Sequence, residues 1–294
     1  EAWLWAVAQR DTTLLGPVLV SLQHFYSLKG RAPEGAELLA QAAERLDEQP
    51  LDEAHTLTLA RIRTFQSALL IETAEFERAR TLLEASLPVL QRIGTPNETA
   101  FCLSTMGLLA YRTGNYHAAK AHCQAAIELY NALGDARGLA FTVNILGHVY
   151  GDLGEYAAAR QMHEENLARR RAQHDLYGIV YSLNNLGAVA ARSQEFAEAQ
   201  RLYDEAMTLA QTINYRPGLS LGFLNLGALA YRRGDTETAL QLAQQAMTVT
   251  QEINDHRNLA WALVNLGNAN FGLGNYAEAA RYLAAAELAF ALTL

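Results

Sequence analysis

The stretch Tyr181–Gln200, YSLNNLGAVAARSQEFAEAQ, decides the fold, because its composition conflicts with the helix that it predicts. Gly187 lies in the middle of the expected helix, and Asn184 and Asn185 lie beside it. A glycine inside a helix costs about 1 kcal/mol relative to alanine, and asparagine is also a poor helix former. Packing supplies most helical stability in proteins, so we looked for a partner that needs this glycine.

A repeat of 40 residues provides the reason. The glycine recurs at this step, and three further columns keep the same phase: a second glycine seven residues later, an aromatic residue nine later and an alanine twelve later. Four columns would not keep the same 40-residue spacing over five units by chance. The first-glycine column holds Gly107, Gly147, Gly187, Gly227 and Gly267; the second-glycine column holds Gly114, Gly154, Gln194, Gly234 and Gly274; the aromatic column holds Tyr116, Tyr156, Phe196, Thr236 and Tyr276; the alanine column holds Ala119, Ala159, Ala199, Ala239 and Ala279.

Each unit is interpreted as two helices. Helix A holds the first glycine and ends near the second glycine, and the aromatic residue then opens helix B. A residue without Cβ lets the facing helix approach closely, and the alanine column is the natural facing element on helix B. One period before Gly107, Ser67 stands at the glycine position. The segment Thr95–Glu98 is a capping box with proline at the first helical position, so a helix begins there.

Composition excludes several functional classes. The 294 residues are half hydrophobic and carry a formal net charge of −8, which disfavours a nucleic-acid partner. Cys102 and Cys123 are expected to be reduced thiols in a cytoplasmic protein. The charge-free stretch 217–231 is too short to span a bilayer, so no membrane partner is expected. The histidines and cysteines lack metal-ligand spacing, and no catalytic motif is present, so we expect no metal, no cofactor and no enzyme.

The repeat resembles the tetratricopeptide repeat. Its L-G-x2-Y pattern is met at Leu146–Tyr150, and its A-x3-aromatic pattern at Ala199–Tyr203. The unit is longer than the usual length of about 34 residues, the tryptophan position is aliphatic or phenylalanine, and the closing proline is missing. The chain therefore resembles the long-helix variety. We expect an all-α, right-handed superhelical solenoid of about seven helical hairpins, preceded by one extra helix. Residues 1–50 would hold that helix and an atypical first repeat, and residues 51–294 the tandem repeats, as one continuous solenoid.

The N-terminal segment resembles the junction at which helical repeats begin in bacterial STAND-type signalling ATPases and related transcription regulators. In these proteins a nucleotide-binding switch domain precedes a repeat sensor. The chain contains no Walker A motif, and its first residue is Glu1, so we expect it to be part of something longer. The resemblance implies a ligand-sensing arm and an attached nucleotide-binding switch domain.

A helical wheel separates two arcs on helix A. The residues four before, one before and three after the first glycine form an apolar arc, which we expect to face the core. The residues three and two before, and one, four and five after, form the opposite arc. In the resembled family this arc lines a concave groove. The resulting candidate ligand-binding residues are Tyr111, Arg112, Asn144, His148, Asn184, Asn185, Arg192, Asn225, Tyr231, Arg232, Asn265, Asn268 and Phe271.

The chemistry of this arc suits a protein or peptide ligand. Asparagine amides both donate and accept, so a column of them can pair with successive peptide groups; alternatively they fix the register between hairpins. The arginines suggest an anionic feature in the ligand, or else they complement a helix C-terminus. The aromatic residues can anchor a side chain or a sugar, or pack between hairpins. The alternatives to peptide binding are a small sugar-like effector and a constitutive scaffold.

Overall fold

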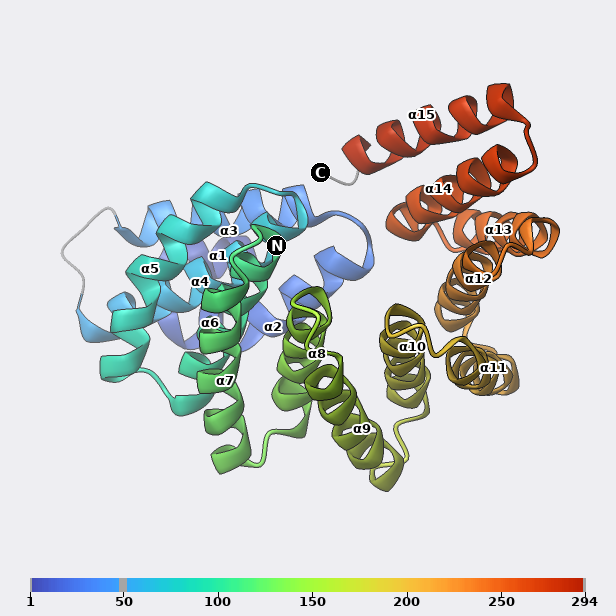
Figure 1. The fold of residues 1–294 in the computed structure, drawn as a ribbon. Helices are drawn as coiled ribbons and strands as arrows, with labels where there is room; N and C mark the ends of the chain where they lie inside the picture. Colours follow the sequence, from blue (N-terminus) through green and yellow to red (C-terminus); the bar gives the residue numbers. More distant parts are fainter. Residues whose placement is uncertain (1, 48–51, 293–294) are drawn as a thin grey trace. The chain divides into compact units, whose positions relative to one another are not determined.

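The computed structural model describes residues 2–47 and 52–292, and within these residues it contains fifteen helices and no strand (Figure 1). The predicted all-α fold, with one extra helix and seven consecutive helix pairs, is therefore confirmed. The helices are α1 (Ala2–Gln9), α2 (Thr12–Leu28), α3 (Ala32–Asp47), α4 (Glu53–Glu72), α5 (Phe76–Ile93), α6 (Pro96–Arg112), α7 (Tyr116–Leu133), α8 (Ala136–Asp152), α9 (Tyr156–Ala172), α10 (Leu176–Arg192), α11 (Phe196–Thr212), α12 (Arg216–Arg232), α13 (Thr236–Glu252), α14 (His256–Gly272) and α15 (Tyr276–Leu292).

The chain divides into two compact units between Val149 and Tyr150. Unit 1 holds α1 to α7 and most of α8, and unit 2 holds the end of α8 and α9 to α15. Within each unit a helix packs against its hairpin partner, and successive A helices also touch, as α4 and α6 do in unit 1 and α12 and α14 do in unit 2. The boundary expected at residues 50 and 51 lies outside the described residues and stays a prediction.

The 40-residue period is built from equal parts. From α8 to α15 every helix has 17 residues, and three residues join each helix to the next. Helix A and helix B are therefore the same length. The B helices α7, α9, α11, α13 and α15 begin at the aromatic column, as predicted. The capping box is also confirmed: Thr95 accepts a hydrogen bond from the backbone of Glu98, and the Glu98 carboxylate accepts one from the backbone of Thr95.

A left-handed residue makes most of the tight turns; the turn between α5 and α6, where Gly94 has a φ of −82°, is an exception. All members of the second-glycine column have positive φ, between 63° at Gln194 and 83° at Gly234. The turns between hairpins use the same left-handed conformation at Gly134 and, in unit 2, at three residues that are not glycine. These three are His174, Asn214 and Asn254, with φ of 52° to 54°. Glycine adopts this conformation without steric cost, whereas other residues adopt it under strain.

The first-glycine column lies where the two helices of a hairpin meet. A Cβ at Gly187 would stand 2.4 Å from the ring of Tyr203, and one at Gly107 would stand 2.5 Å from the sulfur of Cys123. The alanine column facing it is 0–3% exposed. Where serine replaces glycine, the Ser67 hydroxyl donates to the carbonyl of Arg63 on its own helix over 2.7 Å and lies 3.3 Å from the carbonyl oxygen of Ala79, in the alanine column. The close approach inferred from the sequence is therefore confirmed.

Candidate functional site

The predicted site residues lie on the A helices, and most of their side chains are at least partly exposed. In unit 2 these helices are α10, α12 and α14, which pack against one another in order. We call the arc of these three helices opposite the apolar arc the A-helix face. It carries eight of the predicted residues with a partly or fully exposed side chain. They are Asn185, Arg192, Asn225, Tyr231, Arg232, Asn265, Asn268 and Phe271.

Asn184 is the exception. It was expected on an exposed surface, but the structure buries it. Only 1% of the residue is exposed. Its Nδ2 donates to the carbonyl of Val180 on the same helix over 2.9 Å, and its Oδ1 accepts from Asn225 Nδ2 over 2.8 Å. The residue three before the first glycine points toward the neighbouring A helix. Asn184 therefore joins α10 to α12 and is omitted from the candidate contact surface.

Asn225 and Asn265 each reach back to the preceding A helix. Asn225 donates to Asn184, and Asn265 Nδ2 donates to the carbonyl of Leu224 over 3.0 Å. Both bonds join residues 41 apart, as the register alternative predicts. Each amide uses one donor in this way. Within the described chain, the Oδ1 atoms of Asn225 and Asn265 accept no hydrogen bond, so these partly exposed oxygens remain available to a ligand.

The arginines of the A-helix face also contact the preceding hairpin. Arg192 pairs with Asp152 over 2.9 Å, and Arg232 donates to the carbonyl of Ala191 at the C-terminal end of α10 over 3.2 Å. A cation at a helix C-terminus complements the partial negative charge there. For Arg232 this helix is α10 of the preceding repeat, so the Arg232 side chain connects α12 to α10. The Arg192 side chain keeps 39% of its surface exposed.

The aromatic candidates differ between the units. In unit 1, Tyr111 stacks on His148 of the next A helix, with ring centroids 6.1 Å apart and an angle of 22°. Both side chains are partly exposed. In unit 2, Phe271 is 59% exposed and touches Tyr276 edge-on, with centroids 5.4 Å apart. The two remaining candidates also lie on A helices of unit 1. They are Asn144, which is partly exposed, and Arg112, which is exposed.

An exposed aromatic column was missed by the sequence reasoning. It lies six residues before the first glycine, which a helical wheel places within the arc of the candidate residues. Tyr181 is 37% exposed, Phe141 44% and Trp261 52%. The signal was available, because the column keeps the 40-residue step and large apolar side chains rarely gather on an exposed face without a role. Four of its members are aromatic, Phe101, Phe141, Tyr181 and Trp261, and the fifth is Leu221.

Three tyrosines form one cluster at the N-terminal ends of α10 and α12. We call Tyr177, Tyr181 and Tyr215 the tyrosine cluster. The ring of Tyr215 lies edge-on to those of Tyr177 and Tyr181, at centroid distances of 4.8 and 6.1 Å. The Tyr215 hydroxyl donates to the Tyr181 hydroxyl over 3.0 Å. Burial, followed by this hydrogen bond, raises the pKa of Tyr215.

No group of three or more histidine, cysteine, aspartate or glutamate side chains in the described part of the chain is arranged to hold a metal ion. Cys102 and Cys123 are free and fully buried. Burial raises the pKa of each thiol to about 12, so both are inert at neutral pH. Across residues 2–47 and 52–292, every helix is too short or too polar to cross a membrane.

The tetratricopeptide repeat family matches four overlapping segments, which together cover residues 98–287. These segments are 98–172, 139–212, 178–252 and 218–287. The matched region is more than half of the chain. A sequence search among curated proteins found no match.

Three solved structures share the fold at low sequence identity. Aspartyl phosphate phosphatase F from Bacillus subtilis has a TM-score of 0.61 and 12% identity, over 95% of this chain and 94% of that one. NprR in complex with its cognate peptide NprX has a TM-score of 0.61 and 14% identity, over 97% and 75%. A STAND protein with a tetratricopeptide repeat sensor from Pyrococcus horikoshii has a TM-score of 0.60 and 15% identity, over 98% of this chain but 48% of that protein.

Proposed function

Because the chain belongs to the tetratricopeptide repeat family, we propose that it is a binding module that takes a protein or peptide on its A-helix face. The fold it shares with NprR, whose structure holds a cognate peptide, supports this proposal. One observation carries it: exposed aromatic side chains recur along the A helices beside amides with unused acceptor oxygens.

The A-helix face offers two kinds of contact to an extended peptide. Tyr177 and Trp261, 54% and 52% exposed, provide large, rigid surfaces of the kind that dominate binding interfaces. The free Oδ1 atoms of Asn225 and Asn265 can accept from peptide N–H groups. Each such bond contributes about 0.5–1.5 kcal/mol, so several must act together. Hydrogen bonds to the peptide backbone do not depend on the side chains of the ligand, whereas the aromatic residues discriminate between those side chains.

We further propose that this module senses its ligand for a larger cytoplasmic signalling ATPase or regulator. The similarity to a STAND protein that has a repeat sensor supports this context. In that arrangement an attached nucleotide-binding switch domain is held inactive until the ligand arrives. The ligand must bind the active and inactive conformations with different affinities, because equal affinity shifts no equilibrium.

A small sugar-like effector is the second candidate, and the tyrosine cluster favours it. Exposed aromatic rings stack on the apolar faces of sugars, and the Tyr181 hydroxyl can donate to a sugar oxygen. A third reading, a constitutive scaffold, predicts binding without a switch. Size separates the first two, because a pull-down recovers a polypeptide and a thermal-shift screen of metabolites finds a sugar.

The test of peptide binding uses a random peptide display library against the whole chain. The selected peptides are then measured by fluorescence anisotropy with the double variant Tyr177→Ala, Trp261→Ala. We expect at least a tenfold weaker Kd, since truncation of an aromatic anchor costs about 2 kcal/mol or more. Arg201→Ala, on helix B α11, is the control and should leave Kd unchanged. Equal affinity of the double variant, or a library that yields no binder, contradicts the proposal.

A further inference from the structure

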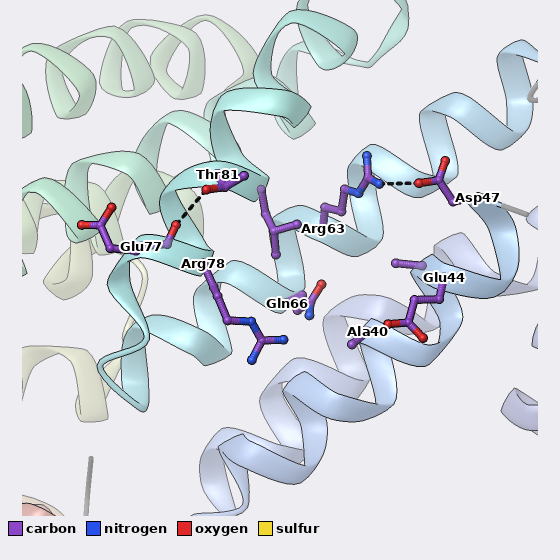
Figure 2. A pocket seen from close by; sticks show the side chains of 10 residues that line it. Ala40, Glu44, Asp47, Arg63, Gln66, Glu77, Arg78 and Thr81 are labelled. Atoms are coloured by element: carbon purple, nitrogen blue, oxygen red, sulfur yellow. Dashed lines mark hydrogen bonds and ion pairs between the residues drawn. The ribbon is translucent and has the colours of Figure 1, made fainter.

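A cavity opens in unit 1 between α3, α4 and α5. It has a volume of about 440 Å³. This lies within the range of about 300–1,000 Å³ that is usual for small-molecule sites. Its lining combines apolar groups from Ala40, Ala43 and Leu82 with several polar side chains, which are drawn in Figure 2. The polar members are Glu44, Asp47, Arg63, Gln66, Glu77, Arg78 and Thr81.

The floor of this cavity breaks the repeat. Arg63 and Gln66 of α4 stand four and one residues before Ser67, at positions that belong to the apolar arc of helix A. Every later repeat has an apolar side chain at both positions. The residues equivalent to Arg63 are Leu103, Val143, Leu183, Phe223 and Leu263, and those equivalent to Gln66 are Met106, Leu146, Leu186, Leu226 and Leu266.

Gln66 is a polar side chain at a position that is apolar in every later repeat. Only 3% of the residue is exposed, and its amide makes no hydrogen bond to the described part of the chain. Neither amide atom is enclosed without a hydrogen-bond partner, so the amide keeps contact with the solvent-accessible space of the cavity. The amide lines the cavity, where it can donate to and accept from a bound molecule.

Opposite charges flank the Gln66 amide. Figure 2 shows it between the side chains of Arg78 and Glu44. Arg78 uses one guanidinium nitrogen on Glu75, over 2.5 Å, and keeps its other donors. Glu44 makes no ion pair within the described residues. Both arginines of the lining thus form an ion pair within the protein, Arg78 with Glu75 and Arg63 with Asp47, the latter over 2.9 Å.

We propose that this cavity is a binding site for a small zwitterion of amino-acid or dipeptide size. The ligand carboxylate binds Arg78, its ammonium group binds Glu44, and its central polar group pairs with the Gln66 amide. Arginine is suited to carboxylates because its planar N–H donors match both oxygens. This site belongs to unit 1, whereas the tyrosine cluster belongs to unit 2, and it does not depend on the peptide-binding proposal.

The experiment measures binding of L-glutamine and L-alanyl-L-alanine to the whole chain by isothermal titration calorimetry. The same compounds with an acetylated amine or an esterified carboxylate lack one charge each. We expect at least one free zwitterion to bind, and each blocked form to bind at least tenfold more weakly. Equal binding of the blocked forms, or no binding of either zwitterion, overturns the proposal.

Two variants link binding to the cavity. Gln66→Met copies Met106 of the next repeat with nearly the same side-chain shape, so it should abolish binding while the melting temperature stays unchanged or rises. Glu44→Gln should weaken binding at least tenfold. Its control is Glu84→Gln, because Glu84 is the equivalent residue one repeat later and lines a similar cavity with Met106. Binding that survives Gln66→Met, or that is lost equally in Glu84→Gln, contradicts the assignment.

Discussion

Single residues of the first-glycine column decide how closely the helices of a hairpin pack. The column is uniform in sequence but not in environment. A Cβ at Gly187 would overlap the buried ring of Tyr203. At Gly227 the nearest atom, the Cβ of Leu242, would be 3.4 Å away, which is an ordinary contact. The two glycines therefore differ in what an added methyl group meets.

This difference predicts opposite effects for two identical substitutions. Gly187→Ala should lower the free energy of unfolding by about 1–3 kcal/mol, because overpacking forces Tyr203 to move. Gly227→Ala should leave it unchanged or raise it by up to about 1 kcal/mol, since alanine is the better helix former. Urea denaturation followed by circular dichroism measures both. If both variants lost the same free energy of unfolding, the space around the added methyl group would not explain the need for glycine at these positions.

Asparagine shows the limit of reasoning at this scale. Asn184 and Asn185 are adjacent in sequence and equally polar, and the wheel places both on the same arc. The structure buries Asn184 between two A helices and leaves Asn185 partly exposed. A wheel describes directions from one helix axis, whereas burial depends on where the neighbouring helix lies. No periodicity in one helix contains that information.

Turns and helix faces are the elements in which the repeat is most regular. The second-glycine column has a left-handed conformation throughout, including Gln194 and, one period before Gly114, Ala74. Left-handed backbone costs a residue with a Cβ about 1–2 kcal/mol. Glycine is free of this strain but loses about 0.5–1 kcal/mol more entropy on folding. The turn geometry is therefore imposed by the two helices that it joins.

Restoring glycine at the exceptional turn should stabilise the protein. Gln194→Gly is expected to raise the free energy of unfolding by up to about 1 kcal/mol. This gain is the backbone strain that is relieved, reduced by the larger conformational entropy of glycine in the unfolded chain. The reverse substitution, Gly234→Gln, should lower it by a similar amount. Differential scanning calorimetry compares the two. A loss of stability in Gln194→Gly would mean that the glutamine side chain contributes more than its backbone strain costs.

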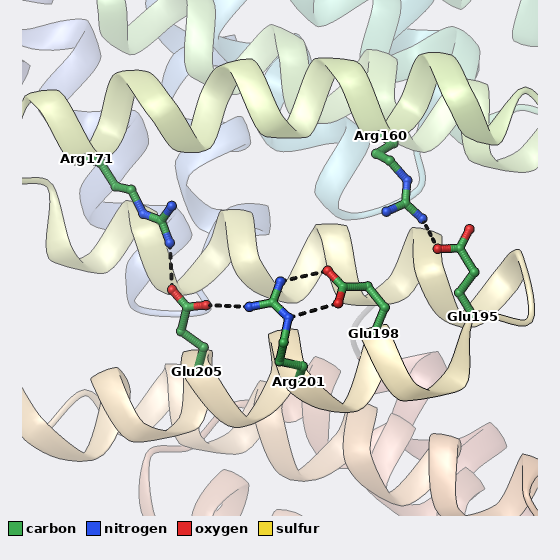
Figure 3. A network of polar contacts seen from close by, with 6 residues as sticks. All are labelled: Arg160, Arg171, Glu195, Glu198, Arg201 and Glu205. Atoms are coloured by element: carbon green, nitrogen blue, oxygen red, sulfur yellow. Dashed lines mark hydrogen bonds and ion pairs between the residues drawn. The ribbon is translucent and has the colours of Figure 1, made fainter.

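The B helices α9 and α11 carry a network of ion pairs (Figure 3). Arg201 binds Glu198 over 2.7 Å and Glu205 over 3.4 Å, and Glu205 also binds Arg171 over 2.6 Å. The hydrogen bond from Arg201 lowers the pKa of Glu198. A lowered carboxylate pKa contributes stability that is present above its ordinary value of 4.5 and is lost as pH falls through the folded value.

The network predicts a small, pH-dependent effect. Arg201→Ala should reduce the free energy of unfolding by less than about 1 kcal/mol at pH 7, because the pairs are exposed and screened. The reduction should disappear below the folded pKa of Glu198. Arg281→Ala is the control, since the Arg281–Glu278 pair has the same spacing but no second glutamate partner within the described residues. Urea titrations at a series of pH values from 7 downward test this; a loss of stability that does not change with pH would exclude a role for the carboxylates.

The whole molecule is built from repeats that contact mainly their neighbours, and such proteins open locally. Both cysteines lie in unit 1, in α6 and α7, whereas Gly187 lies in unit 2. Burial keeps both thiols protonated and covered. A thiol reagent therefore reacts with Cys123 only when α6 and α7 separate, and with Cys102, whose thiol contacts Thr64, only when α6 separates from α4. Thiol labelling is therefore a reporter on unit 1 alone.

Labelling under native conditions should be insensitive to damage in unit 2. We expect Gly187→Ala to change the labelling rate of Cys102 and Cys123 by less than about twofold, because their exposure requires only local opening. Absorbance of the released reagent gives the rate. An acceleration that matches the loss of global stability would instead show that the two units open together.

The sequence by itself determined the period, the pairing of helices and their start points, because each depends on local backbone geometry that recurs every 40 residues. It also placed the arc that carries the candidate ligand residues, although the aromatic column at Tyr181 and Trp261 was overlooked. Only the tertiary structure decided that Asn184 is buried, that Arg232 meets α10, and that Gln66 lies beside a cavity. These facts depend on the distance and angle between neighbouring helices, which are set by the packing of side chains far apart in the sequence.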